Sequence, residues 1–175
     1  MVVRLTDGRE AVRAYVSEHA SHGLDHIIEL VTGDNNRILT LIGDLTEDEG
    51  MTVTPADEWR VYDALRHMTA SLDRSKSRIE ALAAGRAFEN PPGAPGQMSA
   101  EYASFTALRS AYIDGMAEIL GVLRKADGTR NLNGASEHVS FGPFNWLEWS
   151  LYSHHVHTHD HIGQIENIRR ALRGR

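Results

Sequence analysis

Histidine is the residue whose number and spacing stand out in this sequence. Ten of the 175 residues are histidines, and five fall within eight consecutive positions near the C-terminus: His154, His155, His157, His159 and His161. Neutral imidazole is a good ligand for zinc, nickel and copper ions and can also transfer protons near neutral pH. Because helical side chains are separated by about 100° per residue, the five cannot share one face. We expect His154, His157 and His161 to face the core, and His155 and His159 to point toward solvent or a partner.

The periodicity around these histidines supports this division. A run of positions steps by four and three residues, which is typical of a buried helix seam: Leu147, Leu151, His154, Thr158, His161, Ile165, Ile168 and Leu172. His157 lies beside this seam and precedes His161 by four residues, a spacing that lets two imidazoles share one metal ion. His154 and His161 are two turns apart, which is too far for them to chelate the same ion.

Other interpretations of these histidines remain open at this level. A single histidine on an apolar face is usually a hydrogen-bonded core residue, and a histidine-rich run can be an exposed patch that binds metals casually. A specific site would need a third ligand from another helix. The only histidine on the two preceding helices is His67. Its neighbours one turn away, Ala64 and Ser71, are small enough to leave room for a metal ion and a substrate.

The composition excludes several classes of protein and site. The net charge of −6 argues against a dedicated nucleic-acid binder, which normally carries a basic surface. The chain has no cysteine, so disulfides, thiolate nucleophiles and cysteine-based zinc sites are excluded. No apolar run is long enough for a membrane span or a secretory signal. We therefore expect a cytoplasmic protein with neither a nucleic-acid nor a membrane partner.

The elements that must position the histidines are predicted to be helices, since no segment shows convincing strand alternation. Helical periodicity covers residues 10–16, 24–45, 54–85, 99–123 and 144–172. Thr54, Pro55 and Asp57 predict the start of the third helix, Gly85 its end, and Ser99 the start of the fourth.

Long helices with single apolar seams, joined by loops, predict an all-α fold. Connections are expected at residues 90–96 and from Asp127 to about Ser140. The architecture that fits is an antiparallel four-helix bundle with an extra N-terminal helix. Residues 1–175 are expected to form one domain, with residues 1–22 as an N-terminal extension.

Two blocks of the sequence resemble the DinB-like superfamily. Residues 57–68 look like its second core helix, in which a Trp-x-Val opening, here Trp59 and Val61, leads to a metal histidine, here His67. Residues 157–165 resemble its final helix, in which His-x-x-x-His runs directly into x-Gly-Gln-Ile. The order and separation of the two blocks also match, and the resemblance extends from about Leu24 to the end.

The resemblance implies a metal centre and a quaternary state. By it, His67, His157 and His161 are the metal ligands, and an open position holds water or substrate. Gln164 follows His161 by three residues and stays near its face, so we expect it either to orient a ligand or to hold the end of a neighbouring helix, and His154 is the other candidate for a position behind the ligands. Members are compact four-helix bundles that bind zinc, nickel or another divalent transition metal, and a homodimer is expected on the same basis. The N-terminal extension departs from the pattern, and its histidines are interpreted as surface or capping residues: His19, His22 and His26.

The resemblance also implies a class of reaction. Characterised relatives are thiol-dependent S-transferases and isomerases that use a low-molecular-weight thiol such as mycothiol, among them the mycothiol-dependent maleylpyruvate isomerase. The leading hypothesis is thus a metal-dependent transferase, isomerase or hydrolase that activates a small thiol or water against an electrophilic small-molecule substrate. The alternative is a metal- or small-molecule-binding stress-response protein without turnover.

Further polar groups near the histidines are weaker candidates. Glu101, Tyr102, Tyr112 and Tyr152 could line a pocket, although aromatic residues at helical spacing are more often core residues. Asp160 points about 100° away from His161, so we do not expect it to act as a catalytic base.

Overall fold

The computed structural model describes residues 2–89, 101–127 and 132–174, and this part is mostly helical, as expected for an all-α protein. The predicted loop at residues 90–96 and Ser99 itself lie outside the described residues, but the helix predicted to start at Ser99 begins only at Phe105, with Ser104 as its N-cap. The elements follow in this order: η1 (a 3₁₀ turn, Leu5–Asp7), α1 (Arg9–Ser21), α2 (Leu24–Gly43), α3 (Glu47–Met51), α4 (Val61–Ala83), α5 (Phe105–Lys125), β1 (Ser136–His138), β2 (Gly142–Phe144), α6 (Trp146–Leu151), η2 (a π-helical turn, Tyr152–Val156) and α7 (His157–Arg173).

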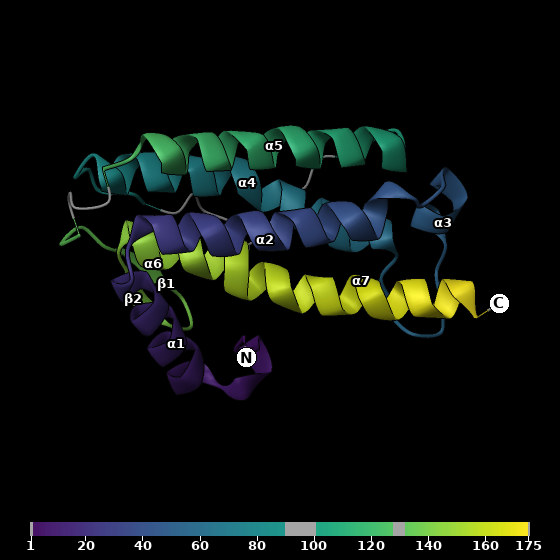
Figure 1. Ribbon diagram of the computed structural model, residues 1–175, viewed down its shortest axis with the longest axis horizontal. Helices are drawn as coiled ribbons and strands as arrows, with labels where there is room; N and C mark the ends of the chain where they lie inside the picture. The colour runs from purple at the N-terminus through teal and green to yellow at the C-terminus, as the bar shows by residue number, and fades with distance from the viewer. Residues whose placement is uncertain (1, 90–100, 128–131, 175) are drawn as a thin grey trace.

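The long helices α2, α4 and α5 and the continuous α6–η2–α7 segment lie lengthwise beside one another (Figure 1). Helices α4 and α5 run in the same direction, since Leu72 packs beside Gly115 and, one turn further along both helices, Lys76 pairs with Glu118 at 2.6 Å. A side chain at Gly115 would require the Leu72 side chain to shift, because its Cβ would lie 2.6 Å from a methyl group of Leu72. Glycine therefore allows these two helices to approach closely.

Helices α2 and α7 also run in the same direction. Asp34 contacts His155 near the start of the C-terminal helical segment, and Arg37, further along α2, pairs with Glu166. Together with the parallel α4 and α5, this corrects the expectation of a simple antiparallel order. The physical reason is that the chain returns, between α4 and α5, to the end at which α4 began.

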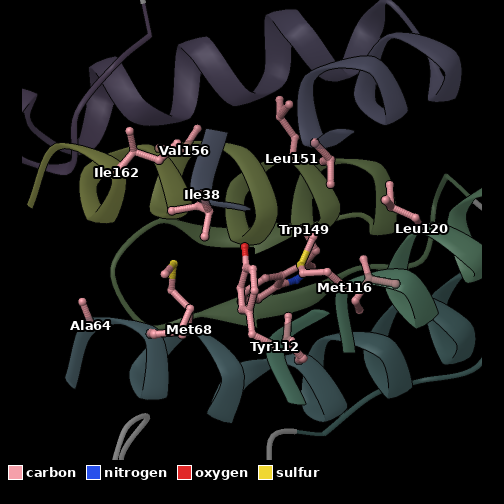
Figure 2. Close-up of a cluster of buried hydrophobic side chains, with 14 of the residues drawn as sticks. Ile38, Ala64, Met68, Tyr112, Met116, Leu120, Trp149, Leu151, Val156 and Ile162 are labelled. Carbon is pink, nitrogen blue, oxygen red and sulfur yellow. The ribbon is translucent and has the colours of Figure 1, made fainter. Parts of the chain in front are cut away.

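Apolar side chains from all of these helices meet in one interior. Figure 2 shows Met68 of α4, Tyr112 of α5, Ile38 of α2 and Leu151 of α6 directed into it. Ile38 and Leu151 are fully buried. Each such side chain contributes about 1.5–3 kcal/mol of hydrophobic stabilisation relative to an exposed position.

The start of α4 differs from the prediction. Thr54 and Asp57 form an isolated bridge in a turn, and the helix begins at Val61 instead. The carboxylate of Asp63 accepts the backbone N–H of Arg60 at 2.9 Å and so satisfies the first turn. Asp57 instead accepts the backbone N–H of Trp59 at 2.8 Å. The end of the helix near Gly85 was predicted correctly.

A short β-hairpin and the short helix α3 were not predicted. Strands β1 and β2 pair in antiparallel register, with Ser136 opposite Phe144, inside and just beyond the predicted connection. Three-residue strands are too short to show alternation in a sequence, and this hairpin is held by the indole N–H of Trp149, which donates to the Ser136 carbonyl at 3.0 Å. Helix α3 begins with a capping box formed by Thr46 and Glu49.

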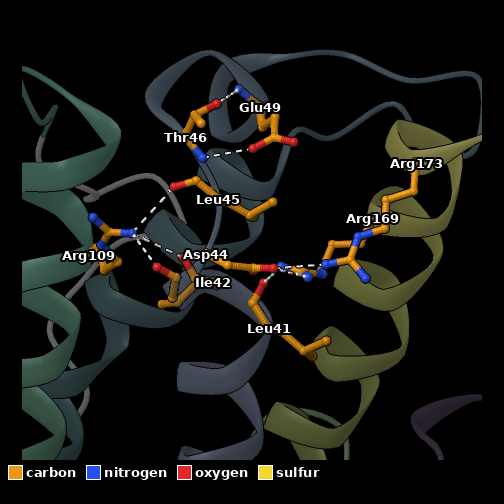
Figure 3. A network of polar contacts seen from close by, with 10 residues as sticks. Leu41, Ile42, Asp44, Leu45, Thr46, Glu49, Arg109, Arg169 and Arg173 are labelled. Carbon is orange, nitrogen blue, oxygen red and sulfur yellow. Dashed lines mark hydrogen bonds and ion pairs between the residues drawn. The ribbon is translucent and has the colours of Figure 1, made fainter. Parts of the chain in front are cut away.

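A polar network holds the C-terminal end of α2 (Figure 3). Asp44 accepts from Arg169 at 3.0 Å and from Arg173 at 2.8 Å, and Arg109 donates to the carbonyl of Ile42 at 3.1 Å. The hydrogen bond from Arg169, together with its charge, lowers the pKa of Asp44 to about 2. The basic C-terminal turn of α7 thereby fixes α2 against α7.

The N-terminal extension contains the expected helix. Val12 and Val16 of α1 are fully buried, and α1 packs against α6 and α2. None of the helices in the described ranges combines the length and the apolar character needed to cross a bilayer.

Candidate metal centre

The C-terminal helical segment is continuous, but it contains a π-helical turn directly before His157. The backbone N–H of His157 donates to the carbonyl of Tyr152, five residues earlier, where an α-helix would bond four residues back. Such turns change the angular position of every following side chain and occur frequently at functional sites. This turn therefore sets the direction in which His157 and His161 project.

Three histidines converge where α4 faces α7, and we refer to His67, His157 and His161 as the inner histidine group. The Nε2 atom of His157 lies 3.3 Å from Nε2 of His67 and 3.3 Å from Nε2 of His161. Their potential ligand atoms all lie within 4.8 Å of one another. Two nitrogens bound to one tetrahedral zinc ion are about 3.3–3.4 Å apart when each metal–nitrogen bond is about 2.0–2.1 Å. The group therefore fits one divalent transition metal ion.

Hydrogen bonds behind the inner group determine which nitrogen of His161 is available. The side-chain amide of Gln164 donates to Oδ1 of Asp57 at 3.2 Å, and its oxygen lies 2.9 Å from Nδ1 of His161. Nδ1 must therefore carry the hydrogen, because an amide oxygen can only accept. The lone pair of His161 is left on Nε2, which is directed at the other two rings.

Burial keeps the inner group neutral. Burial and the neighbouring His161 and His67 rings lower the pKa of His157 to about 3. Burial also lowers the pKa of His67 and of His161. Trp59 packs against the inner group, with its ring stacked on that of His161 at 6.1 Å between centroids. Convergent neutral nitrogens at low local dielectric favour a bound cation rather than a proton.

A cavity of about 670 Å³ opens beside the inner group, a volume typical of small-molecule sites. All three histidines line it, together with residues of α7 and of the N-terminal segment around η1. Asp160 also lines this cavity, and its carboxylate accepts the backbone N–H of Leu5 at 3.1 Å. Asp160 thus holds the N-terminal segment against the cavity.

His154 and Tyr152 lie near the inner group without joining it. His154 is buried, its Nε2 lies 2.7 Å from Oγ of Ser75, and burial lowers its pKa to about 4. The ring of Tyr152 stacks at 6.4 Å on that of His157. His154 therefore connects α4 to the C-terminal segment one turn away from the candidate metal ligands.

The other residues expected to line a pocket, Glu101, Tyr102 and Tyr112, lie away from this cavity. Tyr112 is buried in the core, and Glu101 pairs with Arg66. The backbone of Tyr102 exchanges hydrogen bonds with the hydroxyl of Tyr62. None of these candidates is among the described residues that line the cavity.

The prediction that His155 projects to solvent or a partner is wrong. His155 is 2% exposed, with Nδ1 at 2.7 Å from Oδ2 of Asp34 and Nε2 at 2.9 Å from the hydroxyl of Tyr15. The helical projection used a uniform turn angle and could not include α1 and α2, which cover this face. His159 is half-buried and lines the cavity, with Nδ1 at 3.7 Å from Oδ1 of Asp34. It stays outside the inner group.

Sequence reasoning also missed the role of Asp34, although a signal was present. Asp34 follows Ile27 and Val31 in steps of four and three and precedes Ile38 by four, so it occupies the buried seam of α2. A carboxylate in such a seam needs a polar partner, because an unpaired buried charge is costly. The partner is His155.

No protein-family model, no curated protein and no solved structure matches this chain. The chemistry open to the site is therefore argued from its geometry. Three neutral imidazoles on the wall of an open cavity, with two of their nitrogen–nitrogen distances at tetrahedral spacing, can hold a metal ion and leave one position for a ligand.

Proposed function

We propose that this protein is a metal-dependent enzyme of the DinB-like superfamily. In this proposal His67, His157 and His161 hold a divalent transition metal, zinc or nickel, and the substrate is a small electrophilic molecule attacked by a low-molecular-weight thiol or by water. The observation that carries the proposal is the convergence of three imidazoles on the wall of an open cavity, with Nε2 of His157 at 3.3 Å from Nε2 of each of the other two.

The metal ion would supply Lewis acidity that lowers the pKa of a thiol or water molecule beside it. The chain itself supplies the arrangement around that position. Gln164 and Asp57 hold His161 in the tautomer that presents Nε2, and Trp59 covers the outer side of its ring. Because the chain has no cysteine, a thiol must come from a bound ligand.

Arginine side chains on the cavity wall offer partners to an anionic ligand. Arg4, Arg37 and Arg170 all line the cavity. Of the three acidic lining residues, Asp57 accepts from Gln164, Asp160 accepts from the Leu5 backbone, and Glu166 pairs with Arg37. In the described part of the chain Arg4 makes no ion pair, so its guanidinium is available to a carboxylate. A thiol or electrophile that carries a carboxylate fits this wall best.

The same proposal includes the architecture and the cellular setting. The lengthwise packing of α2, α4, α5 and the α6–η2–α7 segment supports the four-helix bundle that the family resemblance implies. A cytoplasmic homodimer belongs to the proposal as well. Light scattering on the purified protein tests the dimer, and a mass near the 19.4 kDa of one chain would contradict it.

A non-catalytic metal- or small-molecule-binding protein of the stress response would use the same three ligands. The open cavity favours the enzyme, because purely structural metal sites are closed by protein ligands. The two candidates differ in turnover rather than in metal binding.

A thiol-transfer screen with the metal-loaded protein tests the enzyme. Several low-molecular-weight thiols, with and without a carboxylate, are paired with small electrophiles, and hydrolysable esters and amides test water as the nucleophile. We expect metal-dependent turnover that His161→Ala abolishes and that His159→Ala, at a cavity position outside the inner group, retains. If no pair reacts while the metal remains tightly bound, the binding protein replaces the enzyme.

A further inference from the structure

A second histidine group lies where α1 passes into α2, far from the inner group in sequence. His19 belongs to the last turn of α1, His22 is its C-cap, and His26 lies in the first turns of α2. Their potential ligand atoms all lie within 4.8 Å of one another. We refer to these three residues as the outer histidine group. Their interpretation as unrelated surface or capping residues did not anticipate this convergence.

The backbone between the two helices brings these rings together. Gly23 has φ 91° and ψ 178°, a conformation that is essentially restricted to glycine. The turn is tied by two hydrogen bonds, from the N–H of His22 to the carbonyl of His19 at 3.2 Å and from the N–H of Gly23 to that of Ala20 at 3.1 Å. The third imidazole is thereby turned back toward the first.

A hydrogen bond between two imidazoles does not explain the whole group. Nδ1 of His19 and Nε2 of His26 are 3.0 Å apart, which a single N–H···N bond would account for. The ring of His22 also approaches both, at 5.0 Å from His26 and 5.7 Å from His19 between centroids. Three donors that meet in this way match a shared ligand better than a paired interaction.

We propose that the outer histidine group binds a second divalent transition metal ion. An all-imidazole donor set suits zinc, nickel or copper, whereas calcium and magnesium require oxygen ligands. His22 is exposed, so water can complete the coordination from the solvent side. The carboxylate of Glu18 acts electrostatically on His19 and would offset part of the charge of the ion.

The central ligand of the outer group is held by the protein interior. The ring of Tyr15 packs on that of His19 at 4.1 Å between centroids, and its hydroxyl is bonded to the buried His155. His155 is anchored in turn by Asp34. Such support restricts the ring of His19 before any ion binds, which favours affinity. The site shares no ligand with the inner group and does not depend on the proposed enzyme function.

Calorimetric titration of the full chain with Zn²⁺ and with Ni²⁺ tests this site. We expect two ions per wild-type chain, and one per chain in a His67→Ala variant that lacks an inner ligand. In that background, His22→Ala should weaken the remaining ion at least about tenfold, because loss of a direct ligand exceeds the effect of losing an outer hydrogen bond. Asp25→Asn, an exposed non-ligand in the same turn, is the matched control and should not change the affinity.

A spectroscopic readout locates the ion. With Co²⁺ or Ni²⁺ on the His67→Ala background, the imidazole proton resonances of His19 and His26 should be shifted or broadened first. Because His22 is exposed, circular dichroism is expected to show an unchanged fold for His22→Ala. A His67→Ala variant that binds no ion, or that binds one with an affinity that His22→Ala leaves unchanged, would overturn the proposal. Equal loss of affinity in His22→Ala and Asp25→Asn, which indicates non-specific attraction, would also overturn it.

Discussion

The inner and outer histidine groups each contain three imidazole side chains, but the fold assembles them in different ways. The inner group joins α4 to α7 across 90 residues, and its ligands are half-buried beside a cavity. The outer group spans eight residues around one glycine turn, and one of its ligands is exposed. The inner site therefore exists only when the tertiary fold exists, whereas the outer site depends mainly on one local turn.

The surroundings of the two groups differ as much as their origin. In the inner group, Gln164 fixes the tautomer of a ligand, and Asp57 fixes Gln164. In the outer group the support acts through ring packing of Tyr15 on His19. Hydrogen-bonded ligands beside a cavity suit catalysis.

The largest expected effect is a loss of metal affinity at the inner group alone, caused by removing its central ligand, His157. His157→Ala should weaken binding of the inner ion at least about 100-fold, since both short nitrogen–nitrogen contacts of the group involve His157. Binding of the outer ion should not change. Chelator competition followed by calorimetry measures the two affinities separately.

His159→Ala is the control for this variant, because His159 lines the same cavity one half-turn away without joining the group. It should retain the inner affinity within about threefold, as expected for a substitution outside the ligand set. Equal losses in the two variants would show that the ligand assignment is wrong.

The second expected effect is a loss of stability at acid pH, and it comes from His154, which is buried beside the inner group. Burial and, to a lesser degree, Arg78 lower the pKa of His154 to about 4, compared with 6.5 for an ordinary histidine. Between these values the unfolded chain binds a proton that the folded chain does not. The free energy of unfolding should therefore fall as the pH is lowered from 6.5 to 4, by roughly 3 kcal/mol from this residue.

Urea denaturation at several pH values measures this dependence. His154→Asn keeps a polar partner for Ser75 but cannot be protonated, so the slope near pH 5 should decrease by about one proton. Ser75→Ala keeps the imidazole and should retain the slope at a lower overall stability. An unchanged slope in His154→Asn would mean that His154 does not control the acid sensitivity.

Local signals in the sequence were sufficient for the main helices. The helix predicted for residues 24–45 is α2 (Leu24–Gly43), despite Gly33 in its middle, because its apolar seam is long and regular. Gly85 has φ 71° and ends α4 as predicted. The spacing of His157 and His161 correctly placed the two rings on one face.

The remaining features depend on contacts between distant segments. The π-helical turn at Tyr152–Val156 has no compositional signature, so the projection of His155 was wrong. Burial of His155 requires knowledge that α1 covers it, and no pattern within the C-terminal helix carries that information. Asp57 was interpreted as a helix-capping residue, whereas its carboxylate contacts Gln164, 107 residues away.

The third expected effect tests the hydrogen bonds behind the inner group. Gln164→Ala removes the acceptor that holds the hydrogen on Nδ1 of His161. Loss of such a partner typically costs about 10–100-fold in metal affinity. The inner ion should weaken by this factor, and the outer ion should not change. An inner affinity equal to that of the wild type would show that Gln164 does not orient His161.

The smallest expected effect tests whether the two groups are independent. Tyr15→Phe removes the hydroxyl that is hydrogen-bonded to Nε2 of the buried His155 at 2.9 Å. The free energy of unfolding should fall by about 1 kcal/mol, the usual cost of one buried hydrogen bond. The phenyl ring can still pack on His19, so the outer affinity should change only about twofold to threefold.

Thermal and urea denaturation measure the stability of this variant, and calorimetry measures both ions. Tyr102→Phe is the control, because no hydrogen bond of its hydroxyl is described and its contacts with Tyr62 use the backbone. The inner affinity should not respond to either variant. A loss of inner affinity in Tyr15→Phe alone would contradict independence. It would instead show that Asp34, which lies 2.7 Å from His155 and 3.7 Å from His159, transmits changes from the outer group to the cavity.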